Sequence, residues 1–165
     1  ILQDVFLFAD TIYNNITLYN DQISLKDVQS AAKKLEIHEF ISSLPNGYNF
    51  NVSERGVTLS SGQRQLIAFL RVLVNNPDIL ILDEATSSID SYSEDLIKNA
   101  TKKITKGKTS IIIAHRLSTI ESADKIIYME NGKILEQGNP KELLNIENGN
   151  FKKLYQEQLL EEELI

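Results

Sequence analysis

The spacing of apolar residues changes along the chain, and each change predicts a different element. Between Ser24 and Leu44 apolar side chains recur every three or four residues, which predicts one or two helices. The same spacing runs from Ser60 to Val74. Ser60 and Gln63 stand in capping-box positions, where a hydroxyl and an amide satisfy the free backbone N–H groups of a helix start.

Short apolar runs without helical spacing predict strands. Residues Ile79–Leu82 and Thr109–Ala114 are of this kind, and both suit strands that are buried on their two faces. A helix that starts at Asp90 or Ser91 and ends near Ile104 would connect them. Buried strands that alternate with helices predict an α/β fold, and the helical stretch before the first strand is expected to form a separate lobe.

The sequence pattern predicts secondary structure less clearly near the first residue than near the last. The stretch up to Tyr19 starts extended and then loses its alternation. Near the other end, Ile126–Met129 and Lys133–Glu136 flank an Asn-Gly pair, which is a strong signal for a β-hairpin. Helices are expected to follow at Pro140–Asn145 and Phe151–Glu162.

Composition narrows the class of protein. The chain has 165 residues, of which 42% are hydrophobic, so one packed domain is plausible. Its net charge of −6 argues against a broad nucleic-acid-binding face, and the lack of cysteine excludes disulfides and thiolate metal sites. Apolar runs such as Ile111–Ala114 are too short to span a bilayer. Because the first residue is Ile and the only methionine is Met129, we expect the chain to be a piece of a longer protein.

Two adjacent carboxylates follow the first predicted strand. Asp83 and Glu84 would lie beyond the carboxyl end of that strand, where open α/β sheets bind ligands. There Asp83 could hold Mg²⁺ beside phosphate oxygens, and Glu84 could deprotonate a water molecule. The alternative is that Asp83 caps a helix and Glu84 is solvated.

Three further features carry candidate chemistry, each with a structural alternative. The segment Leu59–Gln63 joins hydroxyls and a glycine to a helix start, which is a ready anion site but also an ordinary capped helix. His115 closes the second predicted strand, where an imidazole could contact a terminal phosphate or serve the structure alone. Gln3 could reach a metal or a water molecule, although one glutamine proves nothing by itself.

In their order along the chain, these segments resemble the nucleotide-binding domain of ABC ATPases. Gln3 matches that family's Q-loop, LSSGQ its signature, Asp83 and Glu84 its Walker B motif, residues 87–90 its D-loop, and His115 its switch loop. The resemblance implies a P-loop NTPase-like core, with a mostly parallel sheet flanked by helices and an α-helical subdomain. Residues 1–165 would be a partial domain without its N-terminal part, with 9–76 as the helical subdomain and 77–165 as the rest of the ATP-binding core.

The resemblance also implies the cofactors and the roles of individual residues. The ligands would be ATP and Mg²⁺, the metal being held by Asp83 and Gln3. The catalytic residues would be Glu84, His115 and Gln3. The nucleotide of a second domain would be contacted by the remaining matched residues, which are Leu59, Ser60, Ser61, Gly62, Gln63 and Asp90. The partners would be a second ABC ATPase domain, in a head-to-tail homodimer or heterodimer, and transmembrane domains that place the chain at the cytoplasmic face of the membrane.

Other stretches are similar to exporters rather than importers. The loop with Glu54 and Arg55 resembles the exporter loop that touches the membrane domains, and His38 occupies a position that we interpret as structural. The alternative subclass, soluble ABC ATPases of DNA repair or chromosome maintenance, gives no reason for these flanks. Ser61 stands where the family usually has glycine, which predicts weaker or altered phosphate contact.

The chain lacks the phosphate-binding loop of the family. The only similar stretch is Gly107–Thr109, but Lys102 stands where the motif needs glycine, and a strand follows instead of a helix. We therefore expect a turn there, and very weak ATP binding without hydrolysis by the chain alone. The alternative to an exporter ATPase is a catalytically dead module that acts only by binding a partner. The sequence encoded upstream of Ile1 separates the two, while the transported substrate cannot be predicted.

Overall fold

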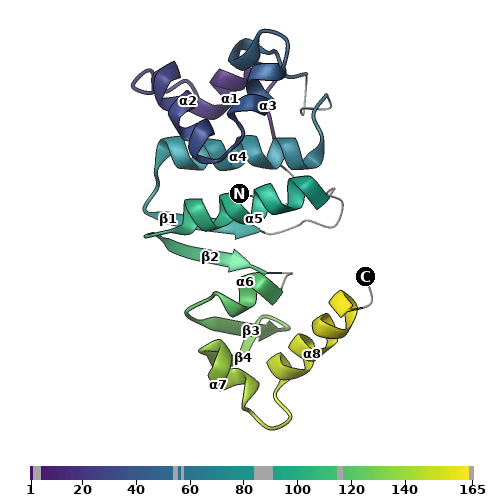
Figure 1. Cartoon of the computed structure of the whole chain (residues 1–165). Coiled ribbons are helices and arrows are strands. Elements are labelled where there is room, and N and C mark those ends of the chain that lie inside the picture. The colour runs from purple at the N-terminus through teal and green to yellow at the C-terminus, as the bar shows by residue number, and fades with distance from the viewer. Residues whose placement is uncertain (2–4, 54–55, 57, 84–90, 115–116, 164–165) are drawn as a thin grey trace. The chain divides into compact units, whose positions relative to one another are not determined.

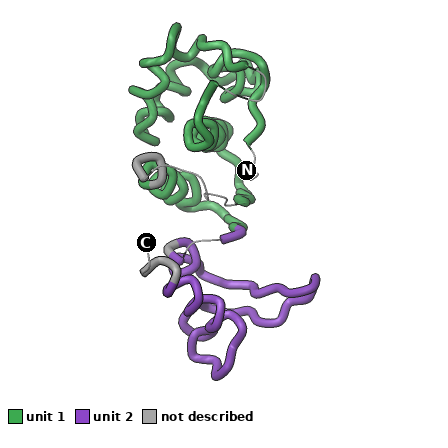
Figure 2. Tube along the Cα trace, turned by 90° about the vertical axis from the view of Figure 1, so that its right-hand side faces the viewer, with its two compact units in different colours: residues 1–112 green, residues 113–165 purple. Residues whose placement is uncertain are grey.

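The computed structural model describes residues 1–165 except 2–4, 54–55, 57, 84–90, 115–116 and 164–165. The chain divides into two compact units, residues 1–112 and residues 113–165 (Figure 2). This division reflects contacts within each unit. The predicted boundary between a helical subdomain and the ATP-binding core, at residues 76 and 77, is a different division and stays a prediction.

Unit 1 is mostly helical and ends in two strands (Figure 1). Its elements are α1 (Ile12–Thr17), α2 (Leu25–Lys34), α3 (His38–Ser43), the short 3₁₀ helix η1 (Gly47–Asn49), α4 (Ser61–Asn75), β1 (Ile79–Asp83), α5 (Ser91–Thr105) and β2 (Thr109–Ile113), whose last residue falls just beyond the unit boundary. The helices predicted in Ser24–Leu44, from Ser60 and between the two strands are confirmed. The first of them begins with a full capping box between Ser24 and Asp27.

Helix α4 lies at the centre of unit 1 and packs against α1, α2 and α5. Its apolar side is buried from Leu66 to Leu70 and partly buried at Leu73 and Val74, because apolar residues recur along it at helical spacing. The side chains with no exposed surface that share this core include Leu7, Ile12, Ile16, Val28, Ile41, Ile67, Leu70 and Ile104. The core therefore joins the start of the chain to α4 and α5.

Strands β1 and β2 form a two-stranded parallel sheet, and α5 is the crossover between them (Figure 1). Ile1 extends the sheet on the other side of β1, since its nitrogen donates to the Ile81 carbonyl oxygen at 2.5 Å and its oxygen accepts from Asp83 N–H at 2.9 Å. The prediction that both strands are buried on their two faces is wrong in this chain. In β2, Ile111 and Ile113 are 57% and 52% exposed. Ile79 and Ile81 are 62% and 57% exposed, because no described element covers that face.

The directions of the elements bring several ends together. In Figure 1, α4 runs opposite to β1, and α5 runs opposite to β1 and β2. The N-terminal ends of α4 and α5 and the carboxyl end of β1 therefore lie at the same end of unit 1. This is the end at which open α/β sheets bind ligands.

Unit 2 contains the predicted hairpin and the predicted C-terminal helices. Its elements are α6 (Leu117–Glu121), β3 (Ile126–Glu130), β4 (Lys133–Gly138), α7 (Pro140–Leu144) and α8 (Asn150–Glu163). Strands β3 and β4 are antiparallel, with Glu130 opposite Lys133 beside the Asn-Gly turn. A small core of Ile120, Leu143 and Phe151 holds the helices to the hairpin.

A glutamate on the hairpin fixes the start of α8. The two carboxylate oxygens of Glu136 accept hydrogen bonds from the backbone N–H groups of Asn150 and Phe151, at 2.6 and 3.1 Å. These N–H groups have no partner within their own helix, and a carboxylate is favoured by the dipole at a helix N-terminus. Glu136 therefore links the sheet of unit 2 to its last helix.

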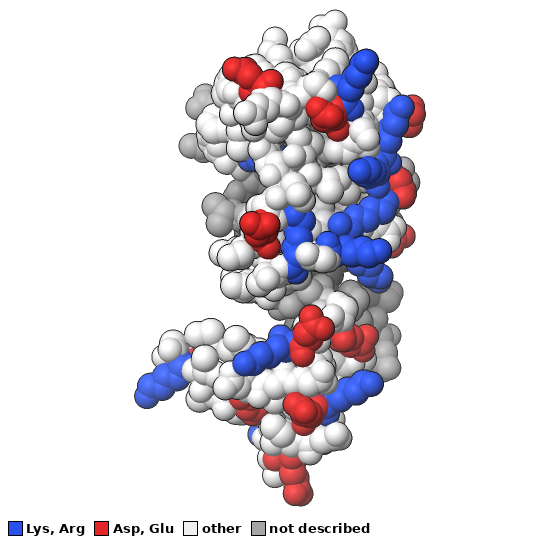
Figure 3. All heavy atoms as spheres, turned by 90° about the vertical axis from the view of Figure 1, so that its left-hand side faces the viewer, with Lys and Arg blue, Asp and Glu red and all other residues white. Residues whose placement is uncertain are grey.

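The surface of unit 1 carries a band of lysines on one side (Figure 3). Lys33 and Lys34 lie in the last turn of α2, and Lys102 and Lys103 lie in the last turn of α5. The two helix ends meet, because Lys103 Nζ donates to the Lys34 carbonyl oxygen and to Glu36 Oε1, both at 2.7 Å. Cations at helix C-termini are stabilised by the helix dipole, which explains the band structurally. Among the described helices, none is both long enough and apolar enough to cross a bilayer.

Candidate functional site

The segment Leu59–Gln63 forms the start of α4, as predicted. Ser60 is the N-cap, and its Oγ accepts from the Gln63 N–H at 3.2 Å while Gln63 Oε1 accepts from the Ser60 N–H at 3.0 Å. Leu59 and Gly62 are buried, whereas Ser60 and Ser61 are exposed at the helix tip. Two exposed serines thus stand at the positive end of the helix dipole, which is an arrangement that suits anions.

An arginine on α4 shapes the loop in front of this helix tip. Arg64 Nη1 donates to the Leu59 carbonyl oxygen at 2.6 Å and to the Gly56 carbonyl oxygen at 3.5 Å. Gly56 has a φ of +68°, and a Cβ there would lie 2.9 Å from Arg64 Cδ and 3.1 Å from Leu7 Cδ1. Only glycine fits this position without strain, so the loop is held close to the side of α4.

Asp83 is the last residue of β1 and lies at the same end of unit 1 as the tip of α4 (Figure 1). It is partly exposed, and its backbone is fixed by the bond to Ile1. Among the described residues, no three His, Cys, Asp or Glu side chains gather into a metal-binding group. A partly exposed carboxylate suits Mg²⁺ that takes its other oxygen ligands from phosphates and water.

Four predicted site residues lie outside the described residues: Gln3, Glu84, Asp90 and His115. Glu54 and Arg55, of the exporter-like loop, also lie outside them. Three of the four are next in sequence to a described residue at or near the end of a helix or strand: Glu84 follows Asp83, Asp90 precedes Ser91 and His115 follows Ala114. Their roles stay predictions.

A polar cluster without a motif in the sequence joins α1 to the C-terminal half of α4. Asn15 is fully buried in α1, and its side chain bonds the backbone of residues 8–11. Arg71 on α4 donates from Nε to the Asn15 carbonyl oxygen at 2.8 Å. Burial lowers the pKa of the Arg71 guanidinium, which stays protonated at neutral pH. The sequence carries little signal for it, because Asn15 stands between Asn14 and Ile16 and its partner Arg71 lies 56 residues away.

His38 has a structural environment. Its Nδ1 lies 2.9 Å from the hydroxyl oxygen of Tyr48, and the two rings stack with their centroids 6.0 Å apart. Burial, helped by the negative charge of Glu39, raises the pKa of Tyr48 to about 12. This pair joins α3 to η1, within the helical part of unit 1.

Gly107–Thr109, the stretch that resembles a phosphate-binding loop, forms the predicted turn into β2. Gly107 has a φ of +73°, and Lys108 N–H donates to the Thr105 carbonyl oxygen at 3.1 Å. Lys108 Nζ is held by Asn76 Oδ1 at 2.7 Å and by the Pro77 carbonyl oxygen at 2.6 Å. This lysine therefore closes the connection between α4 and β1 instead of facing a ligand.

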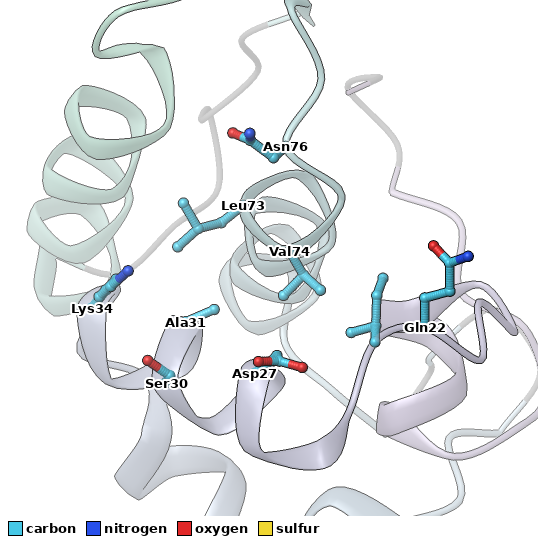
Figure 4. A pocket seen from close by; sticks show the side chains of 9 residues that line it. Gln22, Asp27, Ser30, Ala31, Lys34, Leu73, Val74 and Asn76 are labelled. Carbon is cyan, nitrogen blue, oxygen red and sulfur yellow. The ribbon is translucent and has the colours of Figure 1, made fainter.

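A pocket of about 500 Å³ lies between α2 and the C-terminal end of α4 (Figure 4). Its polar lining includes Asp27, Ser30 and Lys34, and its floor includes Leu73 and Val74. Of the predicted site residues that the structure describes, Leu59–Gln63 and Asp83, none lines it. It lies at the end of α4 that is opposite Ser60, so it is separate from the candidate anion site.

Comparison with known proteins decides the family. Residues 1–87 match the profile of the ABC transporter family, which is more than half of the chain. The chain belongs to the ABC transporter family. The match covers the Leu59–Gln63 segment and Asp83, so the capped tip of α4 and the carboxylate at the end of β1 are parts of an ABC fold.

Its relatives in this family are exporters. The chain is 54% identical over 158 residues to the alpha-hemolysin translocation ATP-binding protein HlyB of Escherichia coli, covering 96% of this chain and 22% of HlyB. It is 49% identical to the putative multidrug export ATP-binding/permease protein YgaD of Bacillus subtilis, covering 94% of this chain and 27% of YgaD. A solved bacterial Atm1-family ABC exporter with ATP bound is 41% identical, with a TM-score of 0.82 over 95% of this chain and 27% of the exporter chain.

These comparisons establish that the chain has the fold of part of an ABC exporter nucleotide-binding domain. The α/β prediction is confirmed, and so is the interpretation of the chain as part of an ABC nucleotide-binding domain. The chain spans only about a quarter of the length of the relatives it matches.

Proposed function

We propose that this ABC chain is the C-terminal part of an ATPase domain that powers export across a membrane. The observation that carries the proposal is the capped tip of α4, with exposed Ser60 and Ser61, at the same end of unit 1 as Asp83. One element suits a phosphate and the other a metal ion, and the translocation and export proteins described above are about half identical to this chain over nearly its whole length.

In the complete domain, ATP and Mg²⁺ would meet residues from two copies. Asp83 and Gln3 would hold the metal, which supplies charge neutralisation between phosphate oxygens. Glu84 would accept a proton from the attacking water, and His115 and Gln3 would orient that water and the terminal phosphate. This division of roles follows from the residue types: a carboxylate for a hard cation, a second for a proton, and neutral donors for the phosphate.

The helix tip would act on the nucleotide of the partner domain. Leu59–Gln63 and Asp90 would close over a triphosphate bound by a second ABC ATPase domain, in a head-to-tail homodimer or heterodimer. The partial positive charge of the α4 N-terminus and the Ser60 hydroxyl support this contact. Ser61 would place a β-carbon near the phosphate, so in a heterodimer it would mark the weaker of two unequal sites.

The link to membrane domains would start from the segment after Gln3. Phe6 and Phe8 stand edge to face with their ring centroids 5.2 Å apart, and their side chains are 54% and 45% exposed. Exposed aromatic pairs are typical of contact surfaces rather than of monomer surfaces. We propose that transmembrane domains cover this pair at the cytoplasmic face of the membrane.

The chain by itself would bind ATP only weakly and would not hydrolyse it. The proposal rests on the missing phosphate-binding loop, because Lys108 is engaged with Asn76 and Pro77. The test compares calorimetric Mg-ATP binding by the 165-residue chain with ATP hydrolysis by the complete transporter that contains it. Turnover by the isolated chain that Glu84→Gln abolishes would contradict this part of the proposal.

In the complete transporter we expect Glu84→Gln to abolish hydrolysis while ATP still binds. Glu130→Gln is the matched control, since Glu130 is exposed on β3 and outside the proposed site. Equal turnover by wild type and Glu84→Gln, or a complete transporter that does not hydrolyse ATP, would refute the proposed function.

A further inference from the structure

Some of the carbonyl groups at the C-terminal end of α1 accept hydrogen bonds from side chains of α4. The last four carbonyl groups of a helix have no partner within it. In α1, the oxygens of Asn14 and Thr17 accept from the next turn, from Leu18 N–H at 2.9 Å and Asn20 N–H at 3.1 Å. The other two accept from side chains of α4. Arg71 Nε donates to the Asn15 oxygen at 2.8 Å, and Asn75 Nδ2 donates to the Ile16 oxygen at 3.3 Å.

The side chain of Asn15 in turn holds the segment that precedes α1. Its Oδ1 accepts from Phe8 N–H at 2.8 Å, and its Nδ2 donates to the Phe8 oxygen at 3.0 Å and to the Thr11 oxygen at 3.0 Å. One buried amide therefore satisfies both backbone groups of Phe8, as a neighbouring strand would. Arg71 also reaches this segment, with Nη2 3.5 Å from the Phe6 oxygen.

These contacts form a continuous polar connection from α4 through α1 to the aromatic segment Val5–Phe8. We propose that Asn15 and Arg71 are positioning residues that make the aromatic segment follow α4 when nucleotide engages the helix tip. The inference rests on the proposed function for the nucleotide, and extends it by naming the residues that carry the movement. Ser61–Gln63 and Arg71 belong to one unbroken helix that Ser60 caps, so a displacement of the tip displaces Arg71 as well.

The residue types suit a rigid connection. Asn15 needs an acceptor and a donor side by side, and aspartate or leucine would remove the donor. Arg71 needs two donors at different angles, one for each carbonyl group, and lysine offers its protons from a single point. The rings of Phe6 and Phe8 remain exposed, so the connection fixes the backbone of a surface segment rather than completing the core.

The first experiment measures amide hydrogen exchange of the 165-residue chain, residue by residue. We expect the Phe8 amide to exchange about tenfold faster in Arg71→Leu, because its bond to Asn15 opens more often. We expect the same in Asn15→Asp, because a carboxylate cannot donate to the Phe8 and Thr11 oxygens and no longer holds the segment in place. Arg71→Lys should be intermediate. Val28→Ala, a core variant in α2, is the control and should accelerate exchange broadly without singling out Phe8. Unchanged Phe8 exchange in Arg71→Leu would overturn the proposal.

The second experiment repeats the measurement on the complete transporter with and without Mg-ATP. In the wild type, we expect ATP to slow exchange both in Leu59–Gln63 and at Phe8. In Arg71→Leu the effect on Leu59–Gln63 should persist, whereas the effect at Phe8 should be lost. Equal slowing at Phe8 in the variant would overturn the proposal. If ATP leaves Leu59–Gln63 unchanged in the wild type, the proposed function fails, and the connection is judged by the first experiment alone.

Discussion

Ser60 has two roles that a single substitution can separate. Its Oγ caps α4 by accepting from Gln63 N–H at 3.2 Å, and its position at the helix tip is where a phosphate would bind. Ser60→Ala should remove the cap and cost about 1 kcal/mol of unfolding free energy. For a chain of this size that loss lowers the melting temperature by about 2–4 °C.

Ser60→Asp should have opposite effects on stability and on function. Aspartate caps as well as serine, and its charge at the helix N-terminus adds about 0.3–1 kcal/mol. The same charge about 4 Å from a phosphate costs about 4 kcal/mol at an effective dielectric constant of about 20. That energy corresponds to about a thousandfold loss of affinity for the nucleotide.

The assays are urea unfolding of the 165-residue chain and ATP hydrolysis by the complete transporter. We expect Ser60→Asp to be at least as stable as wild type and nearly inactive, and Ser60→Ala to be less stable and partly active. Ser24→Ala is the matched control, because Ser24 caps α2 in the same way and away from the helix tip. Full activity of Ser60→Asp would refute the phosphate contact, and lower stability than Ser60→Ala would refute the capping role.

Three further predictions concern stability and association. Glu136→Ala should destabilise unit 2 by about 1–3 kcal/mol, because two N–H groups of α8 lose a charged acceptor. Amide hydrogen exchange should rise most at Asn150 and Phe151, and unchanged exchange at these two residues would contradict the prediction. The pKa of Tyr48 is raised from 10 to about 12, so the stability that its neutral form provides is complete below pH 10 and is lost as pH rises toward 12. Alkaline unfolding of Tyr48→Phe should lack this loss between pH 10 and 12, and identical curves would exclude Tyr48 as its source. Ile79→Lys with Ile111→Lys should reduce self-association of the chain in sedimentation velocity, since both side chains lie exposed on the sheet; a wild-type chain that is already monomeric would contradict this.

The elements that the sequence predicted well are those whose pattern is local. Helix α4 has its cap, its apolar side and the Pro77 stop within one stretch, and the β3–β4 hairpin has its Asn-Gly turn between two short runs. Helix α1 could not be predicted in this way. It has six residues, and two of its last carbonyl groups have partners on α4.

In the candidate site, too, the residues whose placement depends on neighbours in sequence were the predictable ones. The capping box of Ser60 and the position of Asp83 at a strand end depend on neighbours in sequence, and the structure confirms both placements. The exposure of Ile79 could not be inferred from its apolar run, because burial depends on what covers the sheet. The role of Asn15 could not be predicted from the sequence, because its side chain bonds backbone groups that only the folded chain brings together.

The dependence of α1 on α4 also bears on the order in which the chain acquires structure during synthesis. A ribosome releases residues 12–17 long before residues 71–75. An isolated turn of six residues does not hold its shape in water. Residues 12–17 therefore stay unfolded until α4 has left the ribosomal exit tunnel. A pause in translation within residues 18–70 would prolong the exposure of this unfolded segment to proteases and chaperones.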